Sequence, residues 1–384
     1  VGARLRAPLG RAIFPWSRTG RLAGSPSGFC HRPPAKMPSK LRTALTELLG
    51  VEHPVMLAGM GPISGHEIVA AVSNAGGFGT LGLGAGHMVP EGLRKEIHLL
   101  KAALGPGKKF GVDILIPQVG GNARKTNHDY TGGNLAGLVD VMIEEGCSLF
   151  VCAVGVPPQW VVDKLHSAGI PVMNMVGAPH HVLKALERGV DMVCAQGTEA
   201  GGHTGAVATL PLVPQVVDLV RGKKNFFGKQ VPVVAAGGVF DGRGLAAALA
   251  LGAAGVWVGT RFLATPECLT SPVHRKKVLE AKSTDVYQTI LYTGRPCRGV
   301  WATEEYTRKW EESGKIDELC KKGVVPFERD MRKGNAHYYY FNNNIMGQAV
   351  GGITEIKPAA EVVDELITGA LEVLESNSRL IARL

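Results

Sequence analysis

The amino-acid sequence predicts an α/β fold: a closed (β/α)8 TIM barrel with an inserted helical or irregular subdomain between the eighth strand and the last helix. Eight short segments, each apolar throughout its length, alternate with helical segments, and strands that are apolar on both faces belong to a parallel sheet. Eight such units over roughly 220 residues fit a closed barrel. An open doubly wound sheet is the alternative, but its Gly-x-Gly-x-x-Gly fingerprint is absent after the first strand.

The composition fits a large α/β protein that binds neither nucleic acid nor membrane. The 384 residues include 51 glycines and are 45% hydrophobic and 20% charged. Seven of the 42 basic residues, and no acidic residue, lie before residue 37, so most of the net charge of +9 arises there. The rest of the chain holds 35 basic against 33 acidic residues, too even a balance for a nucleic-acid surface. No apolar run reaches the ~20 residues that span a bilayer.

Residues 1–36 are interpreted as a leader that is either disordered or transit-like. Their Arg-rich, acid-free composition is typical of an organellar transit peptide, although the chain starts with Val1 and Met37 could head the mature protein. The last three residues, Ala382-Arg383-Leu384, are a variant of the peroxisomal Ser-Lys-Leu signal. We therefore expect a cytoplasmic protein, with the mitochondrion and the peroxisome as alternatives.

The expected barrel occupies residues 37–264. Its strands are assigned to 54–60, 77–84, 110–117, 149–154, 171–176, 192–195, 231–236 and 255–260. Helices are expected at 64–75, 90–104 and 134–145, after Pro157-Pro158, and at 180–188, 212–220 and 242–251. Ser64 is expected to cap the first of these, because Glu67 follows at capping-box spacing. The polar stretch 118–133 exceeds the usual length of a βα loop and is a candidate lid.

The regular alternation of strand and helix ends after Leu263. Residues 265–346 are charged and aromatic, with short helical stretches, and are interpreted as a subdomain inserted over the barrel mouth. Residues 347–384 are expected to return to the barrel, where a helix at about 358–376 would be the eighth.

The stretch from Asp191 to Gly205 carries the clearest functional signal. An apolar run opens into Gln196-Gly197-Thr198-Glu199-Ala200-Gly201-Gly202 and ends at His203. Adjacent glycines let the backbone approach a ligand closely and present N–H groups to a phosphate or to the edge of a flat ring. A tight turn with a surface histidine is the alternative, but four other predicted strands also lead into glycines, which favours a ligand site.

A barrel would gather distant residues into one ring, because the C-terminal ends of its strands all lie on one face. In this chain the loops after strands seven and eight, which commonly bind phosphate, are Gly237-Gly238 and Gly259-Thr260. A neutral, glycine-lined site suits a mononucleotide. No metal is expected, because no His/Asp/Glu cluster has ligand spacing. The predicted ring consists of Gly59, Met60, Asp113, Gln196, Gly201, Gly202, Gly237, Gly238, Gly259 and Thr260.

Several motifs resemble the nitronate monooxygenase (2-nitropropane dioxygenase) family of FMN-dependent barrels. They are Ala195-Gln196-Gly197, Glu199-Ala200-Gly201-Gly202-His203, Ala235-Ala236-Gly237-Gly238-Val239 and Gly259-Thr260-Arg261-Phe262, in the order that the family has them. The resemblance covers about residues 45–265. FMN-dependent enoyl-acyl-carrier-protein reductases and NAD(P)H:quinone reductases share much of the pattern. IMP dehydrogenase is a more distant relative, whose catalytic cysteine loop has no counterpart in this chain.

The resemblance implies an FMN site and a catalytic histidine. His203 matches the catalytic histidine of the family. Asp113 is a departure, because many members carry asparagine there. A carboxylate beside the flavin would disfavour anionic reduced flavin and an anionic nitronate unless it is protonated or paired. FMN would contact Ala58, Gly59, Met60, Asp113, Gln196, Gly201 and Gly202, with its phosphate held by Gly237, Gly238, Gly259 and Thr260.

The implied reaction is the oxidation of an alkyl nitronate by O2 in an FMN-dependent monooxygenase. A histidine with a pKa near ~6.5 can take the proton from the acidic carbon of a nitroalkane or, when protonated, hold the oxygens of the nitronate. Two alternatives stay open: an NAD(P)H-dependent FMN reductase that acts on an enoyl thioester or quinone, and a flavin-binding barrel without enzymatic activity. The expected partners are a small-molecule substrate and O2, and a homodimer is left open.

Overall fold

The computed structural model of the chain describes residues 41–83, 89–301 and 304–380. The leader at 1–36 and the tripeptide at 382–384, on which the expected locations depended, lie outside these ranges. Within the described ranges, no helix has both the length and the apolar character needed to cross a membrane.

Eight parallel strands form the central sheet, in the order β1-β9-β8-β6-β5-β4-β3-β2. The two end strands meet where Met56 bridges to Phe78 and Leu57 donates its N–H to the Phe78 carbonyl at 2.9 Å. The predicted (β/α)8 barrel is therefore confirmed, and every strand overlaps its expected segment. The strands are β1 (Val55–Leu57), β2 (Gly79–Gly82), β3 (Phe110–Leu115), β4 (Leu149–Ala153), β5 (Val172–Val176), β6 (Met192–Gln196), β8 (Val233–Ala236) and β9 (Gly255–Val258).

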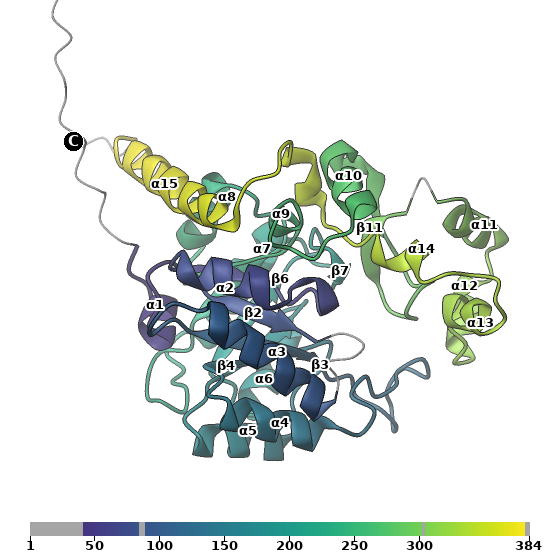
Figure 1. Cartoon of the computed structure of the whole chain (residues 1–384), viewed down its shortest axis with the longest axis horizontal. Helices are drawn as coiled ribbons and strands as arrows, with labels where there is room; N and C mark the ends of the chain where they lie inside the picture. The colour runs from purple at the N-terminus through teal and green to yellow at the C-terminus, as the bar shows by residue number, and fades with distance from the viewer. Residues whose placement is uncertain (1–40, 84–88, 302–303, 381–384) are drawn as a thin grey trace, which may run out of the picture. The chain divides into compact units, whose positions relative to one another are not determined.

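Helices surround the sheet, and α2 to α5 lie side by side outside the strands (Figure 1). The C-terminal helix α15 (Ala359–Ser378) packs against both α8 and α2, so it takes the place of the eighth barrel helix. The other helices of this layer are α2 (His66–Asn74), α3 (Pro90–Ala103), α4 (Leu135–Glu144), α5 (Gln159–Ser167), α6 (His180–Glu187), α7 (Thr209–Val220) and α8 (Gly242–Ala250).

The core has two layers, because successive side chains of a strand point to opposite faces of the sheet. In β3, Val112 and Ile114 point outward and join the apolar layer between strands and helices. Met56 and Trp257 belong to a second cluster inside the barrel, whose N-terminal end is closed by Leu45 and Leu49 of helix α1 (Ala44–Leu49). The alternation of β3 therefore turns its remaining central residue, Asp113, inward.

The loop before α2 differs from the sequence prediction. Gly65 is the N-cap of α2, and Ser64 ends the short helix η1 (Gly61–Ile63), so the predicted capping box of Ser64 and Glu67 does not form. The Ser64 hydroxyl instead accepts a hydrogen bond from the N–H of Met60 at 2.8 Å. Ser64 thereby fixes the chain that follows β1, at the edge of the predicted site.

The segment between β9 and α15, which the sequence analysis interprets as an inserted subdomain, contains strands that the sequence pattern did not predict. β10 (Val286–Thr289) pairs with β11 (Cys297–Val300), and β11 also pairs with β7 (Gly202–His203) (Figure 1). Both inserted strands carry long polar side chains and lack an apolar run. The helices of the segment are α9 (Thr260–Leu263), α10 (Pro272–Glu280), α11 (Glu305–Ser313), α12 (Ile316–Lys321), α13 (Pro326–Arg332) and α14 (Tyr339–Asn342).

An aromatic cluster gives the inserted subdomain its own small core. The rings of Tyr292 and Trp301 are stacked with centroids 4.5 Å apart, and Phe327 packs on Tyr292 at 4.9 Å. All three side chains are buried. This cluster anchors the turn at residues 293–296, which follows Tyr292 and leads into β11.

Candidate active site

The loops after β1, β3 and β9 meet at the C-terminal end of the barrel. A Cβ atom added to Gly59 would lie 2.4 Å from Oδ2 of Asp113, so only glycine fits beside that carboxyl group. On the other side, a Cβ at Gly259 would lie 3.4 Å from the Ala58 Cβ and 3.5 Å from the Met60 sulfur. The barrel thus brings together five of the residues predicted to contact the cofactor.

Asp113 is a buried acid that is neutral at pH 7. Only 7% of the residue is exposed, and its Oδ1 has no hydrogen-bond partner among the described residues. Burial raises the pKa of Asp113 to about 8, because the charged form would be poorly solvated. A protonated carboxyl group can donate a hydrogen bond as an asparagine amide does, so this departure brings no negative charge to the site at neutral pH.

Two side chains hold the glycine loop that follows β6. Gln196 does not project freely from the end of its strand: its Nε2 donates to the backbone carbonyl of His203 at 2.9 Å. Arg298 in β11 donates from Nε to the Thr198 carbonyl at 2.6 Å and from Nη1 to the Val286 carbonyl at 3.0 Å. Because β11 also pairs with Gly202 and His203, the loop is the edge strand of a small sheet.

The loop is also joined to the end of β9. A Cβ at Gly201 would lie 2.7 Å from the Met346 carbonyl carbon and 2.8 Å from the Gly347 nitrogen. Gly347 in turn donates its N–H to the hydroxyl oxygen of Thr260 at 2.9 Å. Gly201 is therefore required for the close approach of two backbones, while the Thr260 hydroxyl proton remains able to donate to a ligand.

The two glycines after β8 have different surroundings. Both have positive φ, +96° for Gly237 and +82° for Gly238. A Cβ at Gly237 would press on the Gly197 carbonyl oxygen at 3.1 Å, whereas the nearest atom to a Cβ at Gly238 is the Glu199 Cβ at 4.0 Å. Gly237 is thus needed for packing, and Gly238 faces open space where a ligand can approach.

His203 is neutral at pH 7. Burial, assisted by the charge of Arg295, lowers the pKa of His203 to about 4. Its Nε2 lies 3.0 Å from the Thr293 hydroxyl, which donates to the Arg295 carbonyl at 3.3 Å. Since that hydroxyl has one proton, the pattern favours donation by Nε2 and leaves the lone pair on Nδ1. His203 can accept a proton, but a positively charged His203, one of its two expected roles, is not populated at neutral pH.

Comparisons with known proteins place this chain in a family. The chain matches the model of the nitronate monooxygenase family over residues 42–369. The chain belongs to this family. It is therefore an oxidoreductase by descent, and the family resemblance read from the sequence is confirmed.

The names of similar proteins point to different substrates. A probable nitronate monooxygenase of Staphylococcus saprophyticus is 33% identical over 71% of this chain and 82% of its own length. A (3aS,4S,5R,7aS)-5-hydroxy-7a-methyl-1-oxo-octahydro-1H-indene-4-carboxyl-CoA dehydrogenase of Mycobacterium tuberculosis is 40% identical over 67% of this chain and 66% of its own length. Among solved structures, FabK from Thermotoga maritima superposes with a TM-score of 0.72 at 32% identity and covers 88% of this chain and 99% of its own.

The candidate site contains residues that the sequence analysis missed. Thr293 and Arg295 lie beside His203, and the β3–α4 loop reaches the same turn through Thr126, whose hydroxyl donates to the Gly294 carbonyl at 3.4 Å. Among the described residues other than glycine, Val154 alone has a positive φ, at 72°. The sequence holds one signal for this turn: an arginine between glycine and proline, in a segment that otherwise reads as irregular.

The residues at the strand ends fit FMN, the cofactor that the family resemblance implies. Three groups can still bind a ligand: the open backbone at Gly238, the hydroxyl proton of Thr260 and the unpartnered Oδ1 of Asp113. No three His, Cys, Asp or Glu side chains gather to hold a metal ion in the part of the chain that the structure describes.

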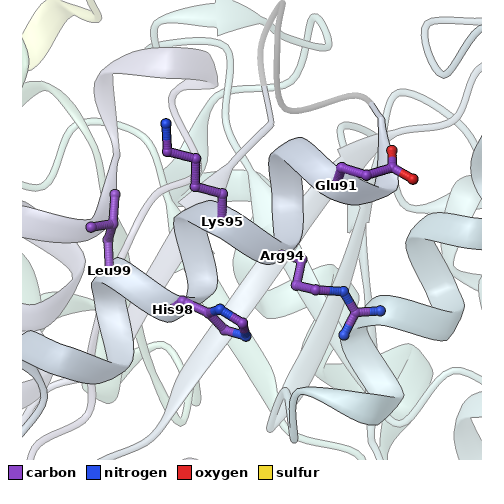
Figure 2. Close-up of a pocket in the computed structure, with 5 residues that line it drawn as sticks. All are labelled: Glu91, Arg94, Lys95, His98 and Leu99. Atoms are coloured by element: carbon purple, nitrogen blue, oxygen red, sulfur yellow. The ribbon is translucent and has the colours of Figure 1, made fainter.

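A separate hollow of about 410 Å³ lies on the outer face of α3 and is not part of this site. Glu91, Arg94, Lys95, His98 and Leu99 line it (Figure 2). Arg94 and His98 are engaged there with Glu145, at 2.6 and 3.1 Å. The hollow is an exposed helix surface whose side chains form ion pairs. None of the residues predicted for the site lines it.

Proposed function

We propose that the chain is an FMN-dependent nitronate monooxygenase that oxidises alkyl nitronates with O2. The observation that carries the proposal is the neutral His203, which the Thr293 hydroxyl links to the backbone of Arg295 and on which the charge of Arg295 acts. A nitroalkane that loses a proton from carbon becomes an anion, so it needs a neutral base and a nearby cation. The similarity to a probable nitronate monooxygenase supports the same reading.

The chain's own groups would hold the cofactor without any charged side chain. Gly238 and the loop ending at Thr260 would take the phosphate, where glycine and helix N–H groups face the ligand. Neutral Asp113 would donate a hydrogen bond to the flavin ring from inside the barrel. Bound there, FMN would supply the acceptor for the electrons that leave the substrate carbon.

His203 would remove the proton from the nitroalkane carbon. Its low pKa makes it a weak base, so proton transfer becomes favourable only as the nitronate charge develops and is stabilised nearby. Thr293 would keep the ring oriented through its contact with Nε2 at 3.0 Å. With a preformed nitronate, no proton has to be removed and His203 is needed only to shape the site.

A second candidate is an oxidoreductase that acts on an acyl thioester. It is favoured by the 40% identity to a dehydrogenase whose named substrate is a coenzyme A thioester. The same neutral base could take a proton from the carbon next to a thioester carbonyl, which is also weakly acidic. The reductase that uses NAD(P)H belongs to this candidate.

Two assays on one preparation test the proposal. The purified chain should release FMN on denaturation and consume O2 with propyl-2-nitronate. In a second cuvette without oxygen, NADH should leave the flavin absorbance unchanged. Rapid bleaching by NADH together with no oxygen uptake from the nitronate would reject the monooxygenase in favour of the reductase, and a chain that cannot be loaded with FMN would reject both.

A further inference from the structure

Arg295 is a buried cation without a carboxylate partner. Only 9% of the residue is exposed, yet among the described residues its guanidinium makes one hydrogen bond, from Nη1 to the Val154 carbonyl at 3.4 Å. Among the described residues no carboxylate acts on this guanidinium: burial lowers its pKa, and the charged or titratable groups that act on it are Tyr130 and Arg124. Burying an unpaired guanidinium is unfavourable, so its position indicates that a ligand supplies the missing negative charge.

Arg298, in the strand β11 that follows this turn, shows what a purely structural arginine looks like. Its guanidinium donates to the Thr198 carbonyl at 2.6 Å, to the Val286 carbonyl at 3.0 Å and to the Thr198 hydroxyl at 3.3 Å. Arg298 is thus occupied by backbone oxygens on several sides. Arg295 has a comparable degree of burial but keeps most of its five N–H donors for something else.

The backbone that accepts the hydrogen bond of Arg295 is strained. Val154 follows β4 and has a φ of 72°, a region that a β-branched residue enters at a free-energy cost. Its carbonyl oxygen is the acceptor for Arg295, and the next residue is held by packing: a Cβ at Gly155 would lie 2.2 Å from the Ile116 carbonyl oxygen. Such strain concentrates at ligand-binding sites, where the surrounding structure fixes it.

Arg295 also interacts with His203, the candidate base. Its charge acts on His203, and the Thr293 hydroxyl connects the Arg295 backbone to the His203 ring. Tyr130, in the β3–α4 loop, lies close enough for its phenol to interact with the same charge. The charge of Arg295 therefore acts both on the candidate base and on a residue of the loop that the sequence indicated as a candidate lid.

We propose that Arg295 is the anion-binding residue of this site and that it holds the two substrate oxygens that share the negative charge, beside His203. The inference deepens the proposed function and rests on it for the identity of the reacting substrate. It assigns a substrate class: small anions with two oxygens on one centre, such as alkyl nitronates and the carboxylates that resemble them, which match the planar fork of a guanidinium. It also assigns to Arg295 the task of holding the nitronate oxygens, which a neutral His203 cannot perform.

The test measures anion binding directly, so it does not depend on turnover. Saturation-transfer NMR with the purified full chain gives the Kd of propionate, with propionamide as the uncharged probe of the same shape. The parent chain should bind propionate and discriminate against propionamide, and R295Q should bind propionate ~10–100-fold more weakly, the usual effect of losing a charged hydrogen bond. R308Q removes an exposed arginine of the same subdomain and should leave the Kd unchanged.

The outcomes separate this inference from the proposed function. Equal propionate affinity in R295Q and the parent, or no preference for propionate over propionamide in the parent, would overturn the role of Arg295 even if nitronate is oxidised. Arginine-dependent propionate binding without nitronate oxidation would keep the anion site and reject the monooxygenase. Should R295Q fail to fold, R295K is compared with R308Q: the lysine lacks the fork and should bind propionate ~3–10-fold more weakly, and unchanged affinity would count against the proposal.

Discussion

Gln196 and His203 are joined by a hydrogen bond of 2.9 Å from the Gln196 amide to the His203 backbone carbonyl. The glutamine ends β6, and the histidine lies in β7, seven residues further along. The contact ties the catalytic candidate to the barrel rather than leaving it on a free loop. It also engages one amide proton of a side chain that the sequence resemblance assigned to the cofactor.

Replacing this glutamine should loosen the glycine loop. In Gln196→Leu the loss of a neutral hydrogen bond, worth about 0.5–1.5 kcal/mol, should speed hydrogen exchange of the amides of residues 198–203 by roughly 2–13-fold. Gln215→Leu is a matched control, because Gln215 also donates Nε2 to a backbone carbonyl, that of Pro211, on the exposed side of α7. Identical exchange in the two variants would show that the Gln196 contact does not restrain the loop.

Replacing the candidate base should separate the two substrates. His203→Asn should keep FMN, since glycines and Gln196 line the expected cofactor site, while activity on neutral nitroalkane falls by roughly 10²–10⁴-fold, the usual share of general-base catalysis. Activity on preformed nitronate should fall much less. Oxygen uptake with both substrates and the flavin content measure this. Equal losses with full flavin content would remove the base role, and loss of flavin or aggregation would indicate a structural histidine.

The pH profile gives an independent check on the same residue. Because the pKa of His203 is about 4, the lone pair is lost only as the pH falls through that value. The acid limb of kcat/KM for nitroalkane should therefore lie near pH 4 instead of near the ~6.5 of an ordinary histidine. A limb at 6.5 that disappears in His203→Asn would show that His203 of the free enzyme is solvated well enough to keep an ordinary pKa.

Asp113 should make the flavin-free chain less stable as the pH rises. Its pKa is about 8 when folded and near 3.8 when unfolded, so between these values the folded state binds the extra proton. The stability contributed by the neutral acid is fully present below pH 3.8 and is lost as the pH rises through 8. Between these two values the free energy of unfolding falls by up to about 1.4 kcal/mol per pH unit. Asp113→Asn should remove this slope in urea unfolding between pH 5 and 8, whereas Asp364→Asn, at an exposed position of α15, should retain it. Parallel pH profiles for Asp113→Asn and the parent would mean that water reaches the carboxyl group.

Gly237 should tolerate alanine far less well than an equally left-handed surface glycine. Gly107 has a φ of 72° and nothing within 4 Å of an added Cβ, so Gly107→Ala carries only the backbone penalty of about 1–2 kcal/mol. Gly237→Ala adds contacts at 3.1 Å with the Gly197 carbonyl and the Thr209 hydroxyl. Its free energy of unfolding should be lower than that of Gly107→Ala by a further ~1 kcal/mol or more in urea titrations. Equal losses in the two variants would show that the loop relaxes around the methyl group.

The barrel could be predicted from the sequence because its signal is local and repeated. Each strand is a short apolar run, as at Leu149–Ala153, and each is followed by a helical segment. Once the strands are assigned to a closed barrel, residues 200 apart become neighbours, and the contact of Gly259 with Ala58 and Met60 follows from topology alone. The prediction that Ser64 caps α2 is wrong. Two kinds of backbone N–H group lie near its hydroxyl, that of Met60 and those at the start of α2, and the hydroxyl accepts from Met60.

The environment of His203 could not be predicted, because its partners come from irregular sequence. Thr293 and Arg295 lie about 90 residues away in a turn with no periodic pattern, and the pairing of β11 with β7 has only two register pairs. The sequence of β11, Cys-Arg-Gly-Val, has a weak strand propensity. The burial of Arg295 is decided by tertiary packing. The neutral state of His203 depends on that packing, so the sequence could name the residue but not its charge.

The pairing of β7 with β11 also sets the order in which the molecule can mature. The eight strands and the helices up to β9 lie within the first 258 residues, yet the strand that carries His203 gains its partner only when residues 297–300 arrive, and these bridge onward from Gly299 to Ile345. Contacts so distant along the chain close late, because the entropy of the intervening loop must be overcome first. During synthesis on the ribosome, a chain long enough to form the barrel sheet will therefore still lack the β7–β11 pairing of the candidate site. Refolding monitored by sheet content should be complete before refolding monitored by activity.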